Sequence, residues 1–435
     1  MDQDKRKKRS DQTGAQRRGI SQEPRAAAEV HLLRSEEKAD RQVRKGRSRQ
    51  VKADMASLPS FDSVLVRYGE IALKDPWTRR SWERTLASNI AHDLREAGID
   101  HQVSLERGRI FVGTSDPRAP GIIADVFGVV SASPVWTCKP DLNAVSKVAS
   151  DIAAERQPAS FAIRSRRGGG EISSNQIAIS AGEAVRARTG SEVDLTDPEL
   201  EIFIEAREKK VLIFTEIVRG VGGLPLGTQP RMLALISGGI DSPVAAWMMM
   251  RRGCPVSLLY FDPRPYVDAL PQALKSAEVL RRWTSGRKIG FIRVPMGAGL
   301  SKIVSSEPRA TCLLCRRLMY RIAKLVMVEE EAFGVVTGYS LGQVASQTPA
   351  NIMAEQSGLD LPIYHPLIAL DKSEITDLAR KIGSYRATAD AGTCTAAPKR
   401  PMTRAKAEEI RAMEEELGIE AMAHDLFAER EKTRI

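Results

Sequence analysis

A short segment rich in glycine and serine carries the clearest chemistry in the sequence. Residues 237–243 read Ser-Gly-Gly-Ile-Asp-Ser-Pro and follow an apolar, strand-like segment that ends at Ile236. Glycines let an anion approach bare backbone N–H groups, and the start of a helix directs unpaired N–H donors at that anion. We expect Ser242 to cap this helix and Pro243 to take its first position. The segment therefore predicts a phosphate-binding turn.

An acid within this turn needs a separate explanation. A generic glycine-rich turn accounts for the glycines and the cap, but a carboxylate at Asp241 repels a phosphate. A bridging Mg²⁺ resolves the conflict, and we expect Asp241 to hold one. The Lys-Ser/Thr pair of a Walker A loop is missing after the glycines, which disfavours ordinary γ-phosphoryl transfer.

The cysteines form a second candidate site. Five are present, with Cys312-Leu-Leu-Cys315 and Cys394 in the C-terminal half. Three thiolates suit a [4Fe–4S] cluster with one iron free to bind sulfide. A persulfide or disulfide role for Cys394 with Cys312 or Cys315, and inert cysteines, stay open as alternatives. Cys138 and Cys254 have apolar neighbours and are predicted to be buried small hydrophobic residues.

Basic residues form a candidate RNA-binding surface. Arg164, Arg166 and Arg167 lead into three glycines, and Lys209-Lys210 lies between two strand-like segments. Clustered basic side chains next to flexible glycines can follow a phosphate backbone. The alternative is a solvated edge strand that uses its charge to avoid aggregation.

The elements around the glycine-rich turn predict a parallel sheet. From Met232 onward, short apolar strands alternate with helices, a pattern typical of a sheet wound on both faces, with ligands at the carboxyl ends of the strands. The expected strands are 233–236, 256–261, 290–294 and 334–337, and the expected helices are 243–252, 271–284, 315–330 and 371–382.

The segments before Met232 predict two smaller α/β units. A helix over 79–97 follows a strand at 64–68, and a strand with a turn at Arg107-Gly108 covers 103–112. The second unit is expected to contain a helix over 122–129, a strand at 161–167, a helix over 174–188 and a hairpin-like pair at 200–206 and 211–215. Residues 220–227, rich in Gly and Pro, indicate a linker.

Charge and composition bound the cellular setting. The net charge is +10, and residues 1–55 hold 16 Lys/Arg against nine Asp/Glu. Most of the positive excess therefore belongs to this segment, which we predict to be a disordered extension. Alternatively, translation of the natural protein begins at Met55. No apolar stretch approaches a membrane span of about 20 residues, and no signal-peptide core is present. Sparse cysteines argue against a secreted disulfide framework. We expect a cytoplasmic protein without a membrane partner.

The glycine-rich turn resembles the signature of the PP-loop ATP pyrophosphatases, which cleave ATP between its α and β phosphates. From about Val64, the chain is similar to the tRNA 4-thiouridine synthetase (tRNA sulfurtransferase) family. The stretches that carry this resemblance are 66–74, Phe127-Gly128 with Ser133-Pro134, Asp194-Leu195 with Asp197-Pro198, 222–227, 237–243, 337–348, and Pro366 with Asp371-Lys372. Gln229-Pro230 departs from the family, where a small residue is more usual.

The resemblance implies an α/β multidomain fold and a set of site residues. Its parts would be the extension (1–55), a ferredoxin-like α+β domain (56–112), a THUMP RNA-binding domain (113–219), a linker (220–230) and a PP-loop domain with a parallel sheet flanked by helices (231–435). Catalytic roles fall to Asp241, Ser237 and Cys394. The implied ATP contacts are Leu235, Ile236, Ser237, Gly238, Gly239, Asp241, Ser242, Tyr260, Phe261, Arg316, Gly338 and Gln347. Taken singly, Tyr260 and Phe261 are more typical of core residues.

The implied activity is ATP-dependent thiolation of tRNA. ATP would adenylate O4 of uridine 8, and sulfur would then displace AMP and leave 4-thiouridine. Some family members also supply sulfur for the thiamine thiazole. The short branch of the family lacks a rhodanese domain and uses a cluster, as these cysteines suggest; the sulfur donor would be sulfide or the persulfide of a cysteine desulfurase. Open alternatives are 2-thiolation, amidation, or a tRNA-binding protein with an inactive pyrophosphatase, and a homodimer is left open.

Overall fold

The computed structural model describes residues 60–106, 108–168, 172–344, 346–388 and 392–435. The extension expected over residues 1–55 and the glycines at 169–170 lie outside these ranges, so those predictions stay untested. Among the described residues, no helix is both long enough and apolar enough to cross a membrane.

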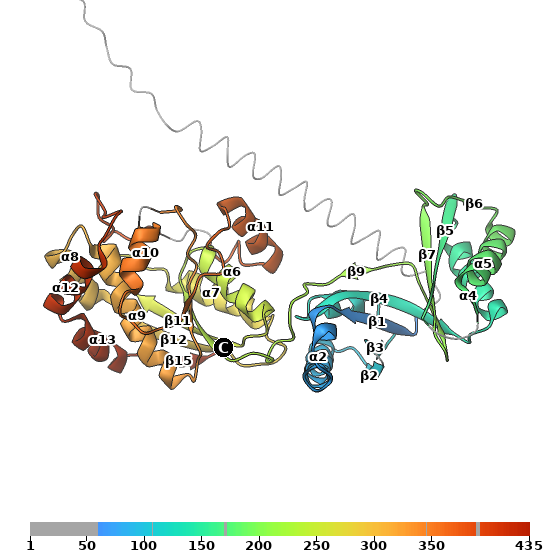
Figure 1. Cartoon of the computed structure of the whole chain (residues 1–435), viewed down its shortest axis with the longest axis horizontal. Helices are drawn as coiled ribbons and strands as arrows, with labels where there is room; N and C mark the ends of the chain where they lie inside the picture. The colour runs from blue at the N-terminus through green and yellow to red at the C-terminus, as the bar shows by residue number, and fades with distance from the viewer. Residues whose placement is uncertain (1–59, 107, 169–171, 345, 389–391) are drawn as a thin grey trace, which may run out of the picture. The chain divides into compact units, whose positions relative to one another are not determined.

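One large sheet organises the first part of the described chain (Figure 1). Its strands run in the order β2-β3-β1-β4-β8-β7-β5-β6, and β9 also pairs with β4. The elements, in chain order, are β1 (Ser63–Tyr68), η1 (Glu70–Leu73), α2 (Pro76–Glu96), β2 (Gln102–Glu106), β3 (Arg109–Gly113), α3 (Ala119–Ala124), β4 (Val129–Cys138), α4 (Leu142–Arg156), β5 (Ser160–Arg167), α5 (Ser174–Thr189), β6 (Glu192–Val193), β7 (Leu200–Ala206), β8 (Val211–Phe214) and β9 (Val218–Arg219).

The long strand β4 belongs to both halves of this sheet. Its first residues pair antiparallel with β1, in the register Val64↔Pro134. Its last residues pair with β8, in the register Thr137↔Leu212. The two halves of the sheet therefore share one continuous strand, and the backbone hydrogen bonds of that strand connect them.

A second sheet forms the C-terminal part, in the order β14-β13-β10-β11-β12-β15. Pairing is parallel from β14 to β12, and β15 joins antiparallel. The elements are β10 (Met232–Ile236), α6 (Asp241–Arg251), β11 (Val256–Asp262), α7 (Leu270–Arg281), β12 (Gly290–Pro295), α8 (Gly297–Ser306), α9 (Thr311–Glu329), β13 (Val335–Val336), α10 (Pro349–Gln356), β14 (Ile363–Tyr364), α11 (Lys372–Ile382), α12 (Ala407–Leu417), α13 (Ile419–Ala428) and β15 (Glu431–Arg434).

Helices cover both faces of this second sheet. Successive strand residues point to opposite faces, so Ala234 joins the apolar cluster with α6, α7 and α11, while Leu233 joins the cluster with α9, α12 and α13. Figure 1 shows α9, α12 and α13 together on one side and α6 and α7 on the other. The predicted parallel sheet flanked by helices is confirmed.

Two local predictions need correction. The helix expected over 122–129 is wrong, because α3 ends at Ala124 and β4 begins at Val129. Gly128 lies between them with a φ of 102°, a backbone angle that no helix tolerates. The expected strand over 103–112 is two strands, β2 and β3, which pair antiparallel up to Glu106↔Arg109; Arg107 of the predicted turn lies outside the described residues.

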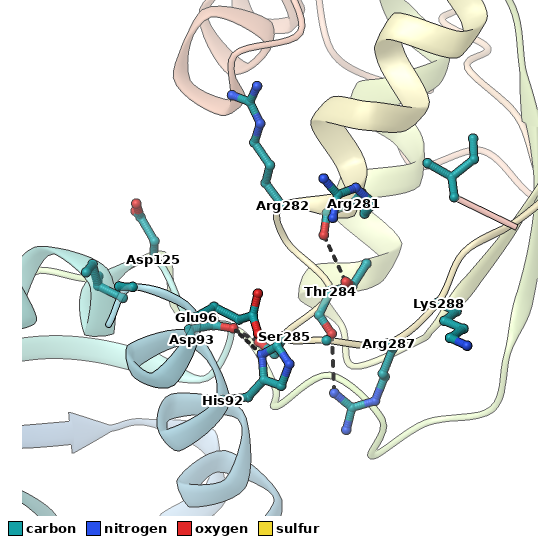
Figure 2. Close-up of a pocket in the computed structure, with 14 residues that line it drawn as sticks. His92, Asp93, Glu96, Asp125, Arg281, Arg282, Thr284, Ser285, Arg287 and Lys288 are labelled. Atoms are coloured by element: carbon teal, nitrogen blue, oxygen red, sulfur yellow. Dashed lines mark hydrogen bonds and ion pairs between the residues drawn. The ribbon is translucent and has the colours of Figure 1, made fainter. Parts of the chain in front are cut away.

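A cavity of about 690 Å³ lies between α2 and the segment that follows α7 (Figure 2). Ser285 Oγ donates to Asp93 Oδ2 over 3.0 Å, and Arg287 Nη1 donates to Asn89 Oδ1 over 2.9 Å. None of the residues expected to bind ATP lines this cavity. The contacts instead fix α2 against the PP-loop domain.

Candidate functional site

The glycine-rich turn is held by its own two serines. Ser242 Oγ accepts from the Ser237 backbone N–H over 2.9 Å and lies 3.0 Å from Ser237 Oγ. The Gly239 N–H donates to Ser237 Oγ over 3.3 Å. These hydrogen bonds join the two ends of the turn.

The helix after the turn begins earlier than expected. The predicted cap at Ser242 is wrong, because α6 begins at Asp241 and Ile240 occupies the cap position without a side-chain hydrogen bond. Ser242 instead closes the turn from within the first helical turn. The first N–H groups of α6 consequently have no side-chain cap, which leaves them free to bind an anion.

Two side chains from distant parts of the chain meet the Asp241 carboxylate. Lys372 Nζ lies 2.7 Å from Oδ1, and Gln343 Nε2 donates to Oδ2 over 3.0 Å. Lys372 is the first residue of α11. A cation and an amide thus stand beside the predicted metal ligand, at the carboxyl end of the sheet.

The loop after β13 packs closely against the first residues of α6. A Cβ at Gly338 would lie 2.9 Å from the Ser242 nitrogen and 3.0 Å from the Asp241 carbonyl carbon, so only glycine fits. On the same loop, Gln347 is buried, and its Oε1 has no hydrogen-bond partner among the described residues. A buried amide oxygen without a partner is costly and is typical of a ligand site. The structure brings Gly338 against the start of the helix that follows the turn, and Gln347 lies farther along the same loop.

The aromatic residues at the end of β11 are core residues. Tyr260 is 2% and Phe261 6% exposed, and they join the clusters on opposite faces of the sheet. The Tyr260 ring stacks on Phe291 with centroids 6.2 Å apart. Parallel pairing aligns Tyr260 with Ile236, so the backbone of β11 ends beside the turn. Any contact with ATP here involves the backbone rather than exposed rings.

The three candidate cysteines gather in one region. Cys312 and Cys315 lie on the first turn of α9, and Cys394 is close enough for its charge to raise the pKa of both thiols. Burial is the larger cause: it raises the pKa of Cys315 to about 12 and also raises that of Cys312. Within the described residues, no three His, Cys, Asp or Glu side chains stand close enough together to hold a metal. As placed, the thiols do not form a cluster site.

The other two cysteines are held in their thiol form. Burial raises the pKa of Cys138 and of Cys254 to about 11. Cys254 is buried, as predicted, whereas Cys138 is partly exposed.

Arg316, the expected phosphate ligand, has a protein partner. Its Nη1 donates to Glu355 Oε1 over 2.9 Å, and its guanidinium carbon lies 4.6 Å from the centroid of the Tyr339 ring. Glu355 is fully buried on α10. Arg316 follows Cys315 directly, so the expected ATP contact and the cysteine pair share one helix turn.

The basic residues of the THUMP portion divide into two sets. Because β5 and β7 are parallel, Arg166 and Arg167 lie at the same sheet end as the turn with Lys209 and Lys210. Lys210 forms an ion pair with Glu106 there, with Lys210 Nζ 2.5 Å from Glu106 Oε1. Farther back, Arg164 pairs with Glu201 over 2.8 Å.

Sequence reasoning did not assign roles to several residues of this site. These residues are Lys372, Gln343, Tyr339 and Glu355. They reach the site through tertiary structure, and no local motif marks Glu355. Lys372, Gln343 and Tyr339 had one signal, since Asp371-Lys372 and residues 337–348 are among the stretches that carry the family resemblance.

Comparison with known families matches three consecutive parts of the chain. A model described as ThiI ferredoxin-like domain covers residues 63–133, and a THUMP domain model covers 140–216. A model described as thiamine biosynthesis protein (ThiI) covers 227–419. The shared strand β4 spans the interval between the first two matches.

Relatives of known name match most of the chain. A probable tRNA sulfurtransferase of Methanosarcina acetivorans is 46% identical over 375 residues, which are 83% of this chain and 91% of the relative. A probable tRNA sulfurtransferase of Methanothermobacter thermautotrophicus is 37% identical over 390 residues, which are 86% of this chain and 98% of the relative. A crystal structure of a 4-thiouridine synthetase–RNA complex with bound ATP superimposes with a TM-score of 0.77 at 27% identity, covering 86% of this chain and all of that one. With this identity and coverage, the chain belongs to the tRNA sulfurtransferase family.

Proposed function

We propose that this chain uses ATP to transfer sulfur to a uridine of tRNA and forms 4-thiouridine. The observation that carries the proposal is that Lys372 and the backbone at Gly338 both meet Asp241 at the glycine-rich turn. The names of the relatives and the ATP-bound 4-thiouridine synthetase support the same assignment.

In the first step, O4 of the uridine attacks the α-phosphorus of ATP, and pyrophosphate leaves. The uncapped N–H groups of α6 bind phosphate oxygens, and Lys372, 2.7 Å from Asp241, neutralises charge on the leaving pyrophosphate. Mg²⁺ fits this site, since it prefers one or two carboxylates together with substrate phosphates. Asp241 would hold it, and the ion would supply charge neutralisation. Ser237 orients the turn through its two hydrogen bonds.

In the second step, a sulfur nucleophile attacks C4 and AMP leaves, so that the carbonyl oxygen departs as part of AMP. Adenylation is needed because an amide-like oxygen leaves poorly on its own. Two routes for the sulfur follow from the cysteines. Cys312, Cys315 and Cys394 would rearrange to hold a [4Fe–4S] cluster, or Cys394 would act through a persulfide with Cys312 or Cys315. Sulfide would be the donor in the cluster route. In the persulfide route a cysteine desulfurase persulfide would pass its outer sulfur to Cys394; after that sulfur attacks C4 and AMP leaves, the thiolate of Cys312 or Cys315 would attack Cys394 Sγ, forming a disulfide and releasing 4-thiouridine.

Anaerobic purification followed by iron and sulfide analysis separates the two routes. About four iron and four sulfide per chain would support the cluster. Iron-free protein with full activity would support the persulfide route.

The sheet end that carries Arg166, Arg167 and Lys209 is our candidate surface for the tRNA backbone. Because phosphate contacts are electrostatic, substituting Arg164, Arg166 and Arg167 together should weaken tRNA binding and reduce its salt dependence. ATP affinity should change little. Uridine 8 as the target, the domain limits given above and a cytoplasmic location belong to the same proposal.

Nucleoside mass analysis tests this function. Unmodified tRNA is incubated with the protein, MgATP and sulfide, then digested to nucleosides. The expected product is 4-thiouridine, which Asp241→Asn should abolish. Formation of 2-thiouridine or an amidated base would replace the proposal with a different tRNA modification. tRNA binding without AMP release would indicate an inactive pyrophosphatase.

A second role rests on the family model for residues 227–419, which is described as a thiamine biosynthesis protein. Sulfur supplied for the thiamine thiazole would use the same cysteines. Restoration of thiamine-independent growth in a strain lacking its own sulfur carrier enzyme tests this role, and Cys394→Ala should not restore growth.

A further inference from the structure

A buried carboxylate stands outside the glycine-rich turn and has no role in the steps above. Glu355 lies near the end of α10 and is fully buried. Burial raises its pKa, and the nearby Arg316 opposes this effect. A buried carboxylate is expensive unless charged and hydrogen-bonding partners surround it. The hydrogen-bonding partners of Glu355 must therefore offset the cost of its burial.

Each oxygen of Glu355 binds a different segment of the chain. Oε1 accepts from Arg316 Nη1 over 2.9 Å, and Oε2 accepts from the Tyr339 hydroxyl over 2.7 Å. The Arg316 guanidinium carbon also lies 4.6 Å from the Tyr339 ring centroid. The three side chains form a closed triangle, which we name the Glu355 triangle.

Two residues of the triangle are chain neighbours of the two parts of the proposed site, the cysteine pair on α9 and the loop against the glycine-rich turn. Arg316 follows Cys315 in the first turns of α9. Tyr339 follows Gly338, whose backbone faces the start of α6 at a distance that excludes even a Cβ. A shift of the nucleotide loop would therefore move Tyr339, and through Glu355 it would move Arg316.

The Tyr339 corner is fixed from another direction as well. Its ring stacks on His365 with centroids 4.9 Å apart and an interplanar angle of 14°. His365 Nδ1 lies 2.6 Å from Thr337 Oγ1, and Nε2 lies 2.7 Å from the amide nitrogen of Gln356, the neighbour of Glu355. Tyr339 has little freedom to move without Glu355.

We propose that Glu355 is a positioning residue that links ATP binding at the glycine-rich turn to the placement of Arg316 and the Cys312–Cys315 pair. The inference rests on the proposed function only in requiring that ATP binds at this turn. Through the link, the sulfur-carrying side of the site would respond to whether the nucleotide is present.

A matched control exists against the same helix, α9. Glu414 is a buried carboxylate that accepts from Arg317 Nε over 2.7 Å and from Arg321 Nε over 2.8 Å, both on α9. These hydrogen bonds involve neither Tyr339 nor the nucleotide loop. Arg317 also donates to the backbone carbonyls of Ala354 and Glu355. Glu414→Gln thus removes a comparable buried charge beside Glu355 but leaves both side-chain hydrogen bonds of the Glu355 triangle in place.

The experiment measures how ATP changes the alkylation of Cys312 and Cys315. The full-length protein is treated with iodoacetamide with and without MgATP, and peptide mass spectrometry gives the rate at each cysteine. In wild-type protein we expect at least a threefold change on adding ATP. In Glu355→Gln and Tyr339→Phe, the rates with and without ATP should agree within about 1.5-fold, because the hydrogen bond that carries the response is lost. Where iron is bound, the readout is its rate of release to a chelator.

The outcomes separate this inference from the proposed function. Glu414→Gln should keep the wild-type response, and an equal loss in that variant would reduce Glu355 to a structural role. If wild-type protein binds ATP but alkylation does not respond, or if folded Glu355→Gln and Tyr339→Phe keep the full response, the link is refuted. If wild-type protein does not bind ATP at all, the proposed function fails first. Tyr339→Phe keeps the experiment decisive where Glu355→Gln does not fold.

Discussion

Asp241 occupies a position where three favourable interactions meet. The positive end of the α6 dipole, Lys372 and Gln343 all face its carboxylate. When the triphosphate binds, its oxygens compete for Lys372 and for the helix N–H groups. The Asp241 carboxylate would then be available to hold Mg²⁺, which would supply charge neutralisation.

Asp241→Asn should lower tRNA thiolation by at least about 100-fold, the usual cost of losing an electrostatic group at a reaction centre. The free energy of unfolding should change by less than about 1 kcal/mol, because the ion pair with Lys372 is partly exposed. Steady-state kinetics and thermal melts measure both quantities. Asp377→Asn, an exposed position on α11, serves as the control. An Asp241→Asn enzyme with near wild-type turnover would remove Asp241 from the mechanism.

Gly338→Ala tests the close approach of the two loops. The new Cβ would overlap backbone atoms of Asp241 and Ser242, which cannot move aside as a flexible side chain can. We expect ATP to bind at least about tenfold more weakly, equivalent to roughly 1.4 kcal/mol. Gly121→Ala is the matched control, since a Cβ added at Gly121 would have no heavy atom of a neighbouring segment within 4 Å. Equal ATP affinities for the two variants would contradict the packing argument.

At the scale of elements, the loop after β11 sets the position of Cys394. Asp262, at the end of β11, accepts from Arg264 Nε over 2.9 Å and from Arg293 Nη2 over 2.7 Å. The Tyr266 hydroxyl donates to Ser301 Oγ over 3.0 Å, which fixes the middle of the loop. The Tyr266 carbonyl then accepts from both the N–H and the hydroxyl of Thr395. Cys394 is therefore held by its neighbour in the chain.

Thr395→Val should slow sulfur transfer about three- to tenfold, because it removes one neutral hydrogen bond from this anchor and keeps the backbone one. The first step should not change, so pyrophosphate release in single-turnover assays should stay at the wild-type rate, while AMP release should slow together with sulfur transfer. Thr395→Ser keeps the hydroxyl and should restore transfer. Equal defects in the valine and serine variants would show that the hydroxyl does not position Cys394.

Strands and helices that bury apolar residues could be predicted from the sequence, whereas an exposed polar strand could not. Strands β10, β11 and β12 and helices α6, α7, α9 and α11 were found because each buries a regular apolar face. Strand β15 was missed because its residues, Glu-Lys-Thr-Arg, are all exposed, and backbone pairing with β12 alone makes it a strand. In the site, the glycine-rich turn is local in sequence, whereas Lys372 and Glu355 reach it only through the fold.

At the scale of the whole described chain, few polar contacts fix α2 against the PP-loop domain. Asp93 is among them, with Ser285 as a hydrogen-bond donor and with His92 and Arg287 nearby (Figure 2). Burial raises the pKa of Asp93 despite these partners. A carboxyl whose pKa is raised by folding stabilises the fold when protonated. That contribution is complete below the unfolded pKa of about 4 and is lost as the pH rises through the folded value.

Asp93→Asn should therefore raise the free energy of unfolding at pH 7, and this gain should disappear as the pH falls below about 4. Denaturant unfolding at several pH values measures it. Asp116→Asn is the opposite control, since hydrogen bonds from Arg118 lower the pKa of Asp116. The free energy of unfolding of the Asp116→Asn variant should not rise at pH 7. A loss of stability in Asp93→Asn at pH 7 would show that its charged form supports the contact.

The most direct test of the central claim is the stoichiometry of a single turnover. Protein in excess over unmodified tRNA is mixed with MgATP labelled at the α-phosphate and with sulfide, and AMP and 4-thiouridine are followed together. One AMP should form for each 4-thiouridine, and AMP formation should depend on tRNA and be lost in Asp241→Asn. Release of ADP instead of AMP, or thiolation that proceeds without ATP cleavage, would contradict the claim.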